Sequence, residues 1–233
     1  MDASLKLAAY LNSKKPLIGR VVDFDAAADR LLSIDLTENN TELSAVLTDA
    51  NSFSAWVDQQ MAEGGYRYGA GGYMENRTIY NSRNLFTADE APRSLHLGVD
   101  IWAPAGTAVY APLDGIVHSF NDNDNYGDYG PTIILQHDLD GLQLFSLYGH
   151  LSRKNLDELF VGQAISINQK IGDFGSLDEN GHWPPHLHFQ LMLDMEGKHG
   201  DYPGVCSPFQ KQQYLKNIPD PNLLLQFPLA NSR

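Results

Sequence analysis

The pattern of hydrophobic and polar positions divides the chain into a helical beginning and a longer part that is typical of β-structure. Residues 3–12 are predicted to form a short helix, and a second helix is predicted over about residues 53–62. The second helix carries apolar residues at helical spacing: Phe53, Trp56, Val57 and Met61. Asn51-Ser52 supplies suitable N-caps, and Gly64-Gly65 is typical of a helix end.

From Tyr66 onward, Gly, Pro, Asn and Asp interrupt short apolar segments, which is typical of an all-β domain. An earlier alternation of apolar and polar residues also predicts a strand, at Leu32, Ile34 and Leu36. No repeat or low-complexity linker separates the parts. We therefore expect a helical or mixed extension over residues 1–65, a β domain over residues 66–194, and a tail over residues 195–233, with both flanks packed on the β domain.

Composition and net charge exclude several classes of function. The chain has 233 residues, of which 42% are hydrophobic, and no apolar run approaches the length of a membrane span. The 16 basic and 29 acidic residues give a formal net charge of -13, which argues against a nucleic-acid partner and against tight adsorption to an anionic cell wall. The single Cys206 excludes an intrachain disulfide and a cysteine-rich zinc site, and we expect it to be a buried apolar residue.

The candidate chemistry lies in three histidine motifs. His186 and His188 stand two apart in a strand-like segment, so their side chains should share a face and reach one metal, or one metal and one substrate. His96 and Asp100, four apart, would share a face in the same way, and both side chains are good zinc ligands. His150 lies within a third strand-like run, which contains Phe145, Leu147 and Leu151. Each motif alone occurs by chance or serves structure, but together they indicate a zinc hydrolase.

At these residues the chain resembles the lysostaphin-type (LytM-like) zinc metalloendopeptidases, which cut peptides of bacterial peptidoglycan. The resemblance covers about residues 66–194, and it includes Gly98-Val99-Asp100-Ile101, Tyr148-Gly149-His150-Leu151 and Trp183-Pro184-Pro185. It implies an antiparallel β-sandwich in which zinc is bound by His96, Asp100 and His188. It further implies that His150 and His186 are the catalytic histidines.

This assignment is chemically reasonable. Three protein ligands leave a tetrahedral zinc one open position, where a water is acidified to a pKa of about 7. Two free imidazoles can then exchange protons with the water and the leaving amine, and stabilise the oxyanion. The sequence contains no His-Glu-x-x-His motif, which excludes a thermolysin-like helix site.

Two alternatives use the same fold. Residues 109–117, 161–165 and 169–172 also resemble parts of biotinyl or lipoyl carriers and of phosphotransfer modules. However, no Met-Lys-Met turn is present, and a phosphohistidine would not explain Asp100. The other alternative is a non-catalytic scaffold or activator, which would usually lack one or more ligands. The remaining histidines are expected to be structural or solvated: His118, His137, His182 and His199. Residues 122–127 are expected to form a turn and not a calcium loop.

Location and substrate stay open at this point. The first eleven residues have an acidic start and only a brief apolar stretch, so they make a poor signal peptide, which favours a cytoplasmic location unless a leader was removed. The expected substrate is a peptide or a peptidoglycan fragment. Its scissile bond depends on loops expected at about residues 73–92 and 119–131, which the sequence does not define, and the oligomeric state is equally undefined.

Overall fold

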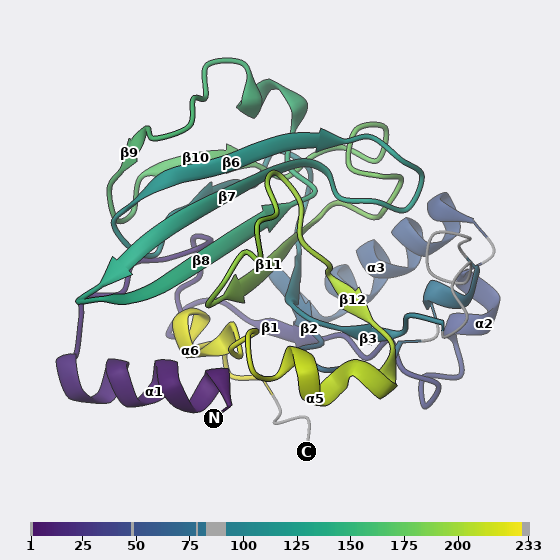
Figure 1. The fold of residues 1–233 in the computed structure, drawn as a ribbon. Helices are drawn as coiled ribbons and strands as arrows, with labels where there is room; N and C mark the ends of the chain where they lie inside the picture. The colour runs from purple at the N-terminus through teal and green to yellow at the C-terminus, as the bar shows by residue number, and fades with distance from the viewer. Residues whose placement is uncertain (1, 48, 78, 83–91, 230–233) are drawn as a thin grey trace.

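The computed structural model describes residues 2–47, 49–77, 79–82 and 92–229. One eight-stranded sheet dominates it (Figure 1). In spatial order the strands are β1 (Leu31–Ser33), β2 (Tyr68–Gly71), β4 (Val99–Trp102), β11 (His186–Met192), β8 (Leu142–Gly149), β7 (Gly130–Leu139), β6 (Gly115–Asn123) and β9 (Ala164–Ile165). The neighbouring strands are antiparallel except for β1 and β2, which are parallel. The expected mainly β fold is confirmed.

Two short ribbons accompany the large sheet. One pairs β5 (Ala108–Tyr110) with β10 (Lys170–Asp173), and the other pairs β3 (Leu95–His96) with β12 (Val205–Cys206). The largest hydrophobic cluster joins Ile101 of β4 and Leu187 of β11 to Val109 of β5. The sandwich arrangement implied by the resemblance stays a prediction.

The centre of the large sheet determines where the candidate chemistry lies. β11 is hydrogen-bonded between β4 and β8, so that His188 is opposite Asp100 on one side and opposite Gly149 on the other. Alternation along β11 then separates two faces, because successive side chains of a strand point in opposite directions. Leu187 and Phe189 enter the main core, whereas His186 and His188 face away from it.

The helices begin and end close to the predicted positions. α1 (Ala3–Lys14) includes the predicted helix of residues 3–12. α3 (Ala50–Gly64) ends at Gly65, which has a φ of 61°. Its N-cap is Asp49 and neither Asn51 nor Ser52, because the Asp49 carboxylate accepts hydrogen bonds from the backbone of both. The shorter helices are α2 (Leu43–Val46), α5 (Lys211–Tyr214), α6 (Asn222–Leu225), η1 (Ile79–Ser82), η2 (Arg153–Leu156) and η3 (Pro208–Gln210).

The N-terminal residues contact the rest of the chain at several points. Phe53, Val57 and Met61 of α3 are buried in a cluster with Trp102 and Trp183. α1 lies beside α6 (Figure 1), and the Ala3 amide donates to the Leu215 carbonyl at 2.8 Å. β1 is shorter than predicted, since Ile34 and Leu36 are buried beyond its end. The division at residues 65 and 194 stays a prediction. None of the described helices combines the length and the apolarity that crossing a membrane requires.

Candidate metal centre

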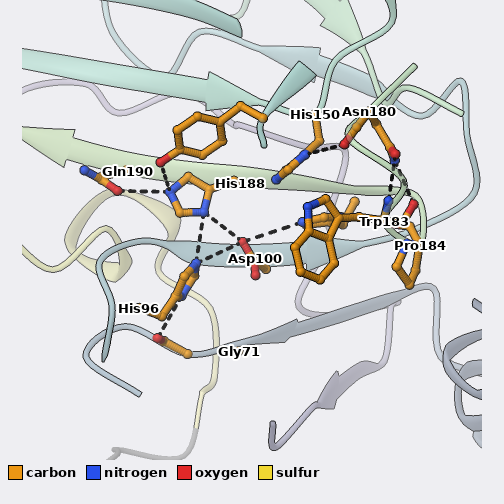
Figure 2. Close-up of polar contacts among 12 residues, drawn as sticks. Gly71, His96, Asp100, His150, Asn180, Trp183, Pro184, His188 and Gln190 are labelled. Atoms are coloured by element: carbon orange, nitrogen blue, oxygen red, sulfur yellow. Dashed lines mark hydrogen bonds and ion pairs between the residues drawn. The ribbon is translucent and has the colours of Figure 1, made fainter. Parts of the chain in front are cut away.

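Three donor atoms from separate strands meet beside the centre of the sheet (Figure 2). The Nε2 of His96 is 2.9 Å from the Nδ1 of His188. The Oδ1 of Asp100 is 3.0 Å from that Nδ1 and 3.3 Å from the Nε2 of His96. All three side chains are buried. In a tetrahedral zinc site with bonds of about 2.0–2.1 Å, two donors are about 3.3 Å apart, so the triangle has close to the size that such an ion requires.

His96 and Asp100 do not share one strand, contrary to the prediction. His96 ends β3 and Asp100 lies on β4, and the chain changes direction between them at Gly98. A Cβ at Gly98 would be 2.7 Å from the Nε2 of His188, so only glycine leaves room for that imidazole. The two side chains converge because of this bend, and their matching parity is incidental.

Outer hydrogen bonds define which ring nitrogens carry hydrogen. The Nδ1 of His96 is 3.0 Å from the Gly72 carbonyl oxygen, so it must donate. Gln190 donates its amide to the Pro203 carbonyl, which turns its Oε1 toward the Nε2 of His188 at 3.0 Å, and that nitrogen must donate as well. The two inner nitrogens therefore carry lone pairs. Lone pairs and a carboxylate oxygen at about 3 Å repel one another, and a cation among them removes the repulsion.

The charges of His96 and Asp100 suit metal binding. Burial lowers the pKa of His96 to about 3, and the positive charge of Arg77 acts in the same direction. Burial acts to raise the pKa of Asp100, but the interactions with His96 and Arg77 outweigh it and hold that pKa well below its ordinary value. At neutral pH the imidazole is neutral and the carboxylate is ionised, which are the protonation states that a metal requires.

His150 and His186 lie beside the triangle, with ring centroids 4.1 Å apart. The Nδ1 of His150 donates to the Asn180 carbonyl at 2.8 Å, and the Nδ1 of His186 donates to the Pro184 carbonyl at 2.7 Å. In both rings the Nε2 is therefore the acceptor, and the Nε2 of His186 is 4.0 Å from the Oδ1 of Asp100.

Burial keeps both of these imidazoles neutral. It lowers the pKa of His150 well below the ordinary value, with His186 and His188 adding to the effect, and it lowers the pKa of His186 to about 4. His150 is not within a strand as predicted, since β8 ends at Gly149 and His150 has a φ of 62°. This left-handed conformation turns the chain at the strand end, beside β11.

A cavity of about 180 Å³ is lined by four of these five residues, Asp100, His150, His186 and His188. Aromatic side chains form much of its wall: Phe53, Tyr80, Trp102, Tyr129, Trp183 and Tyr202. The Trp102 ring stacks on His186 with centroids 5.8 Å apart, and Trp183 meets His186 edge to face. Trp183 is only 6% exposed, so it is both a core residue and a wall residue. Phe53 belongs to α3, which the sequence did not connect with the site.

Three supporting residues were missed by the sequence analysis. Gln190 has the same strand parity as His186 and His188, and this signal would have identified it. Arg77 contacts Asp100 across 23 positions of the chain, and nothing in the local pattern indicated this. Tyr129, whose hydroxyl is 3.4 Å from the Nε2 of His188, follows a turn and not a strand pattern.

The expected substrate loops are only partly described. Residues 78 and 83–91 lie outside the described residues, and β6 and β7 occupy most of residues 119–131, leaving a turn at residues 124–129. Cys206 is buried, as expected, and burial raises the pKa of its thiol to about 11.

The four other histidines make separate contacts. His137 lies between the Asp114 carbonyl and the Ser146 hydroxyl, at 2.8 and 2.7 Å. His118 stacks on His199, and the His182 ring lies against Tyr126. Within the described ranges, His96, Asp100 and His188 are the group in which three side chains that could hold a metal ion converge.

Known proteins resemble the segment that carries this site. The sequence model of peptidase family M23 matches residues 94–201. Peptidoglycan DD-endopeptidase ShyA of Vibrio cholerae serotype O1 is 33% identical over 99 residues, which make up 42% of this chain and 20% of ShyA. This chain thus spans about a fifth of the length of the curated relative that it matches.

Two solved structures are similar in part. The catalytic domain of the antimicrobial peptidase lysostaphin from Staphylococcus simulans is 26% identical, with 69% of this chain and 97% of that one covered and a TM-score of 0.40. A zinc containing peptidase from Vibrio cholerae is 28% identical, with 42% of this chain and 27% of that one covered and a TM-score of 0.34.

Proposed function

We propose that this chain is a zinc-dependent endopeptidase acting on peptidoglycan-type or glycine-containing peptides. Through residues 94–201 it belongs to peptidase family M23, and it is thus a hydrolase of the metallopeptidase class. One observation carries the proposal. Two ring nitrogens and a carboxylate oxygen, all acceptors, converge within 3.3 Å of one another, beside two neutral imidazoles that line an open cavity.

His96, Asp100 and His188 would hold the metal, through Nε2, Oδ1 and Nδ1. Two neutral imidazoles and one carboxylate form a ligand set of the kind found in catalytic zinc sites. When bound, zinc supplies a Lewis acid that polarises an amide carbonyl and acidifies water. The outer contacts of Gly72, Gln190 and Arg77 would keep the three ligands in orientation.

His150 and His186 would move the protons. Each ring is oriented by a backbone carbonyl at its Nδ1, which leaves Nε2 free to accept a proton from the attacking water. The resulting imidazolium can return that proton to the leaving amine, and it can stabilise negative charge on the carbonyl oxygen while it is formed. Because burial disfavours the imidazolium, passing the proton on to the leaving amine is favourable.

The substrate class rests on the relative. ShyA is named a peptidoglycan DD-endopeptidase, and we extend that class to the present chain. The aromatic wall around the metal centre supports a peptide ligand, since Tyr and Trp rings offer apolar area together with hydrogen-bonding groups.

Digestion of defined substrates tests the proposal. The zinc-loaded protein should cleave at least one of two substrates, a cross-linked muropeptide dimer or an oligoglycine peptide, and mass spectrometry should find one water added across the broken amide. A chelator should abolish the cleavage and the His186→Ala variant should slow it by about 10²–10⁴, whereas the exposed His199→Ala variant should retain it. Retained zinc without cleavage of either substrate would contradict the proposal and favour the non-catalytic scaffold.

A further inference from the structure

Arg77 is a buried cation next to the candidate metal centre. It is 2% exposed, and its Nη1 is 2.5 Å from the Oδ2 of Asp100. Its Nε donates to the Glu75 carboxylate at 2.7 Å, and further contacts join it to the Tyr80 hydroxyl and the Gly71 carbonyl at 3.2 and 3.3 Å. Burying a charge costs free energy unless it is paired, so a fully enclosed guanidinium needs a reason to be there.

The backbone before Arg77 is built to hold it. The His96 amide donates to the Glu75 carbonyl at 2.9 Å, and the Arg77 amide donates to the Ser94 carbonyl at 2.8 Å, which joins this turn to β3. Gly72 has a φ of 98°, and a Cβ there would collide with the Nη2 of Arg77. The turn therefore requires glycine at this position to accommodate the guanidinium.

The two oxygens of Asp100 have different partners. Oδ1 faces the inner nitrogens of His96 and His188, while Oδ2 faces Arg77. A carboxylate can bind a metal through one oxygen or through both, and an oxygen that accepts a short hydrogen bond from a fixed guanidinium is turned away from the metal. We propose that Arg77 is a positioning residue that holds Oδ2 of Asp100, so that Asp100 contacts the metal through Oδ1 alone.

This inference rests on the proposed function and gives Arg77 a role in it. A one-oxygen contact keeps the metal four-coordinate, with one position for water or substrate, whereas a two-oxygen contact would add a further ligand and crowd that position. Lysine would not replace arginine here, because an ammonium group is a point charge and cannot bind Asp100 and Glu75 with a planar fork.

Cobalt substitution tests the inference independently of hydrolysis. Four-coordinate Co²⁺ absorbs visible light more strongly than Co²⁺ with an additional ligand. The Arg77→Met variant should still bind one Co²⁺ per chain, but its visible absorption should fall severalfold as Oδ2 joins the ion. With zinc, its hydrolysis rate should fall by about 10–100-fold.

Companion variants keep the test decisive. Arg77→Met/Glu75→Gln removes the carboxylate charge that Arg77→Met leaves unpaired, and Arg77→Lys keeps a positive charge in case the apolar variants do not fold. Both should show the weakened spectrum. The matched control is Arg67→Gln, which removes an exposed arginine paired with Asp29 and should leave the spectrum unchanged.

Two results would overturn the inference, and they are distinguishable. An unchanged cobalt spectrum in the Arg77 variants, with only a lower melting temperature, would make Arg77 a purely structural residue and leave the proposed function intact. If the unmodified protein bound no Co²⁺ or Zn²⁺, the proposed function would fail, and the role of Arg77 would fail with it.

Discussion

His188 lies directly opposite Asp100 in the register of β11 and β4, and its Nδ1 is 3.0 Å from the Asp100 carboxylate. Two of the three proposed ligands are thus held in place by the backbone hydrogen bonds of a central strand pair. We therefore expect the triangle to be largely formed before any metal binds, so that substitutions at these residues change metal binding more than they change the fold.

Metal content should distinguish ligands from their neighbours. Asp100→Ala removes the anionic donor and should empty the site, whereas His150→Ala should retain about one zinc per chain. Elemental analysis of the purified variants measures this directly. Loss of metal from His150→Ala together with its retention in Asp100→Ala would reverse the assignment.

Catalysis should separate from metal binding at the two other histidines. His150→Ala or His186→Ala should keep zinc but lose about 10²–10⁴ in rate, because each removes a group proposed to transfer protons. Rates measured at equal zinc occupancy give the comparison. Unchanged activity in both variants would show that these rings only pack against the cavity wall.

Removal of residues 1–65 should damage the remaining protein. The deletion takes away β1, which pairs with β2, and it exposes the surface that Phe53 and Val57 of α3 cover. Melting temperature and soluble yield should both fall. A truncated protein as stable, soluble and active as the whole chain would show that the extension is detachable.

Trp183→Ala should affect stability as well as binding. The indole is almost fully enclosed, so its loss should cost about 3–5 kcal/mol, and the same ring borders the cavity. Trp183→Phe is the matched variant and should recover much of the stability. Chemical denaturation measures the loss of stability, and KM measures the loss of substrate binding. A raised KM with unchanged stability would show that Trp183 serves only as a wall of the cavity.

Stability should depend on pH through His137. Burial lowers its pKa in the folded protein, while the unfolded chain takes up the proton near the ordinary pKa of about 6.5. The unfolded state then binds more protons below that pH, so stability is lost as the pH falls from about 7 to about 5. With a chelator present to keep metal out of the measurement, the urea midpoint should fall less between pH 7 and pH 5 for His137→Gln than for the unmodified protein. Equal falls would contradict a contribution from His137.

Local sequence rules predicted only part of the way in which the site residues come together. Alternation along a strand is a local property, so the shared face of His186 and His188 could be predicted from their spacing alone. For His96 and Asp100 the same rule assumed one continuous strand, whereas a bend at Gly98 brings them together. A bend depends on what packs against it, here the ring of His188, and a sequence pattern does not record that contact.

Other features were set by competition between nearby residues or by distant contacts. Asp49, Asn51 and Ser52 are all good N-cap types, and the extended backbone of Asp49 decided which one caps α3. Arg77 reaches Asp100 through a turn that is hydrogen-bonded to the β3 segment, so no periodicity in the sequence predicted this contact. The mainly β fold, in contrast, depends on many short apolar segments, and their summed signal was sufficient.

The alternation of β11 also has a consequence for how the protein matures. Leu187, Phe189 and Leu191 are core residues, and His186, His188 and Gln190 between them serve the site. If β11 paired with its neighbours one residue out of register, its imidazoles would point into the hydrophobic core and its leucines would point away from it. Such a misfolded chain would expose apolar side chains and would also lack the site. Cellular quality control that removes aggregation-prone chains would therefore remove the inactive ones as well.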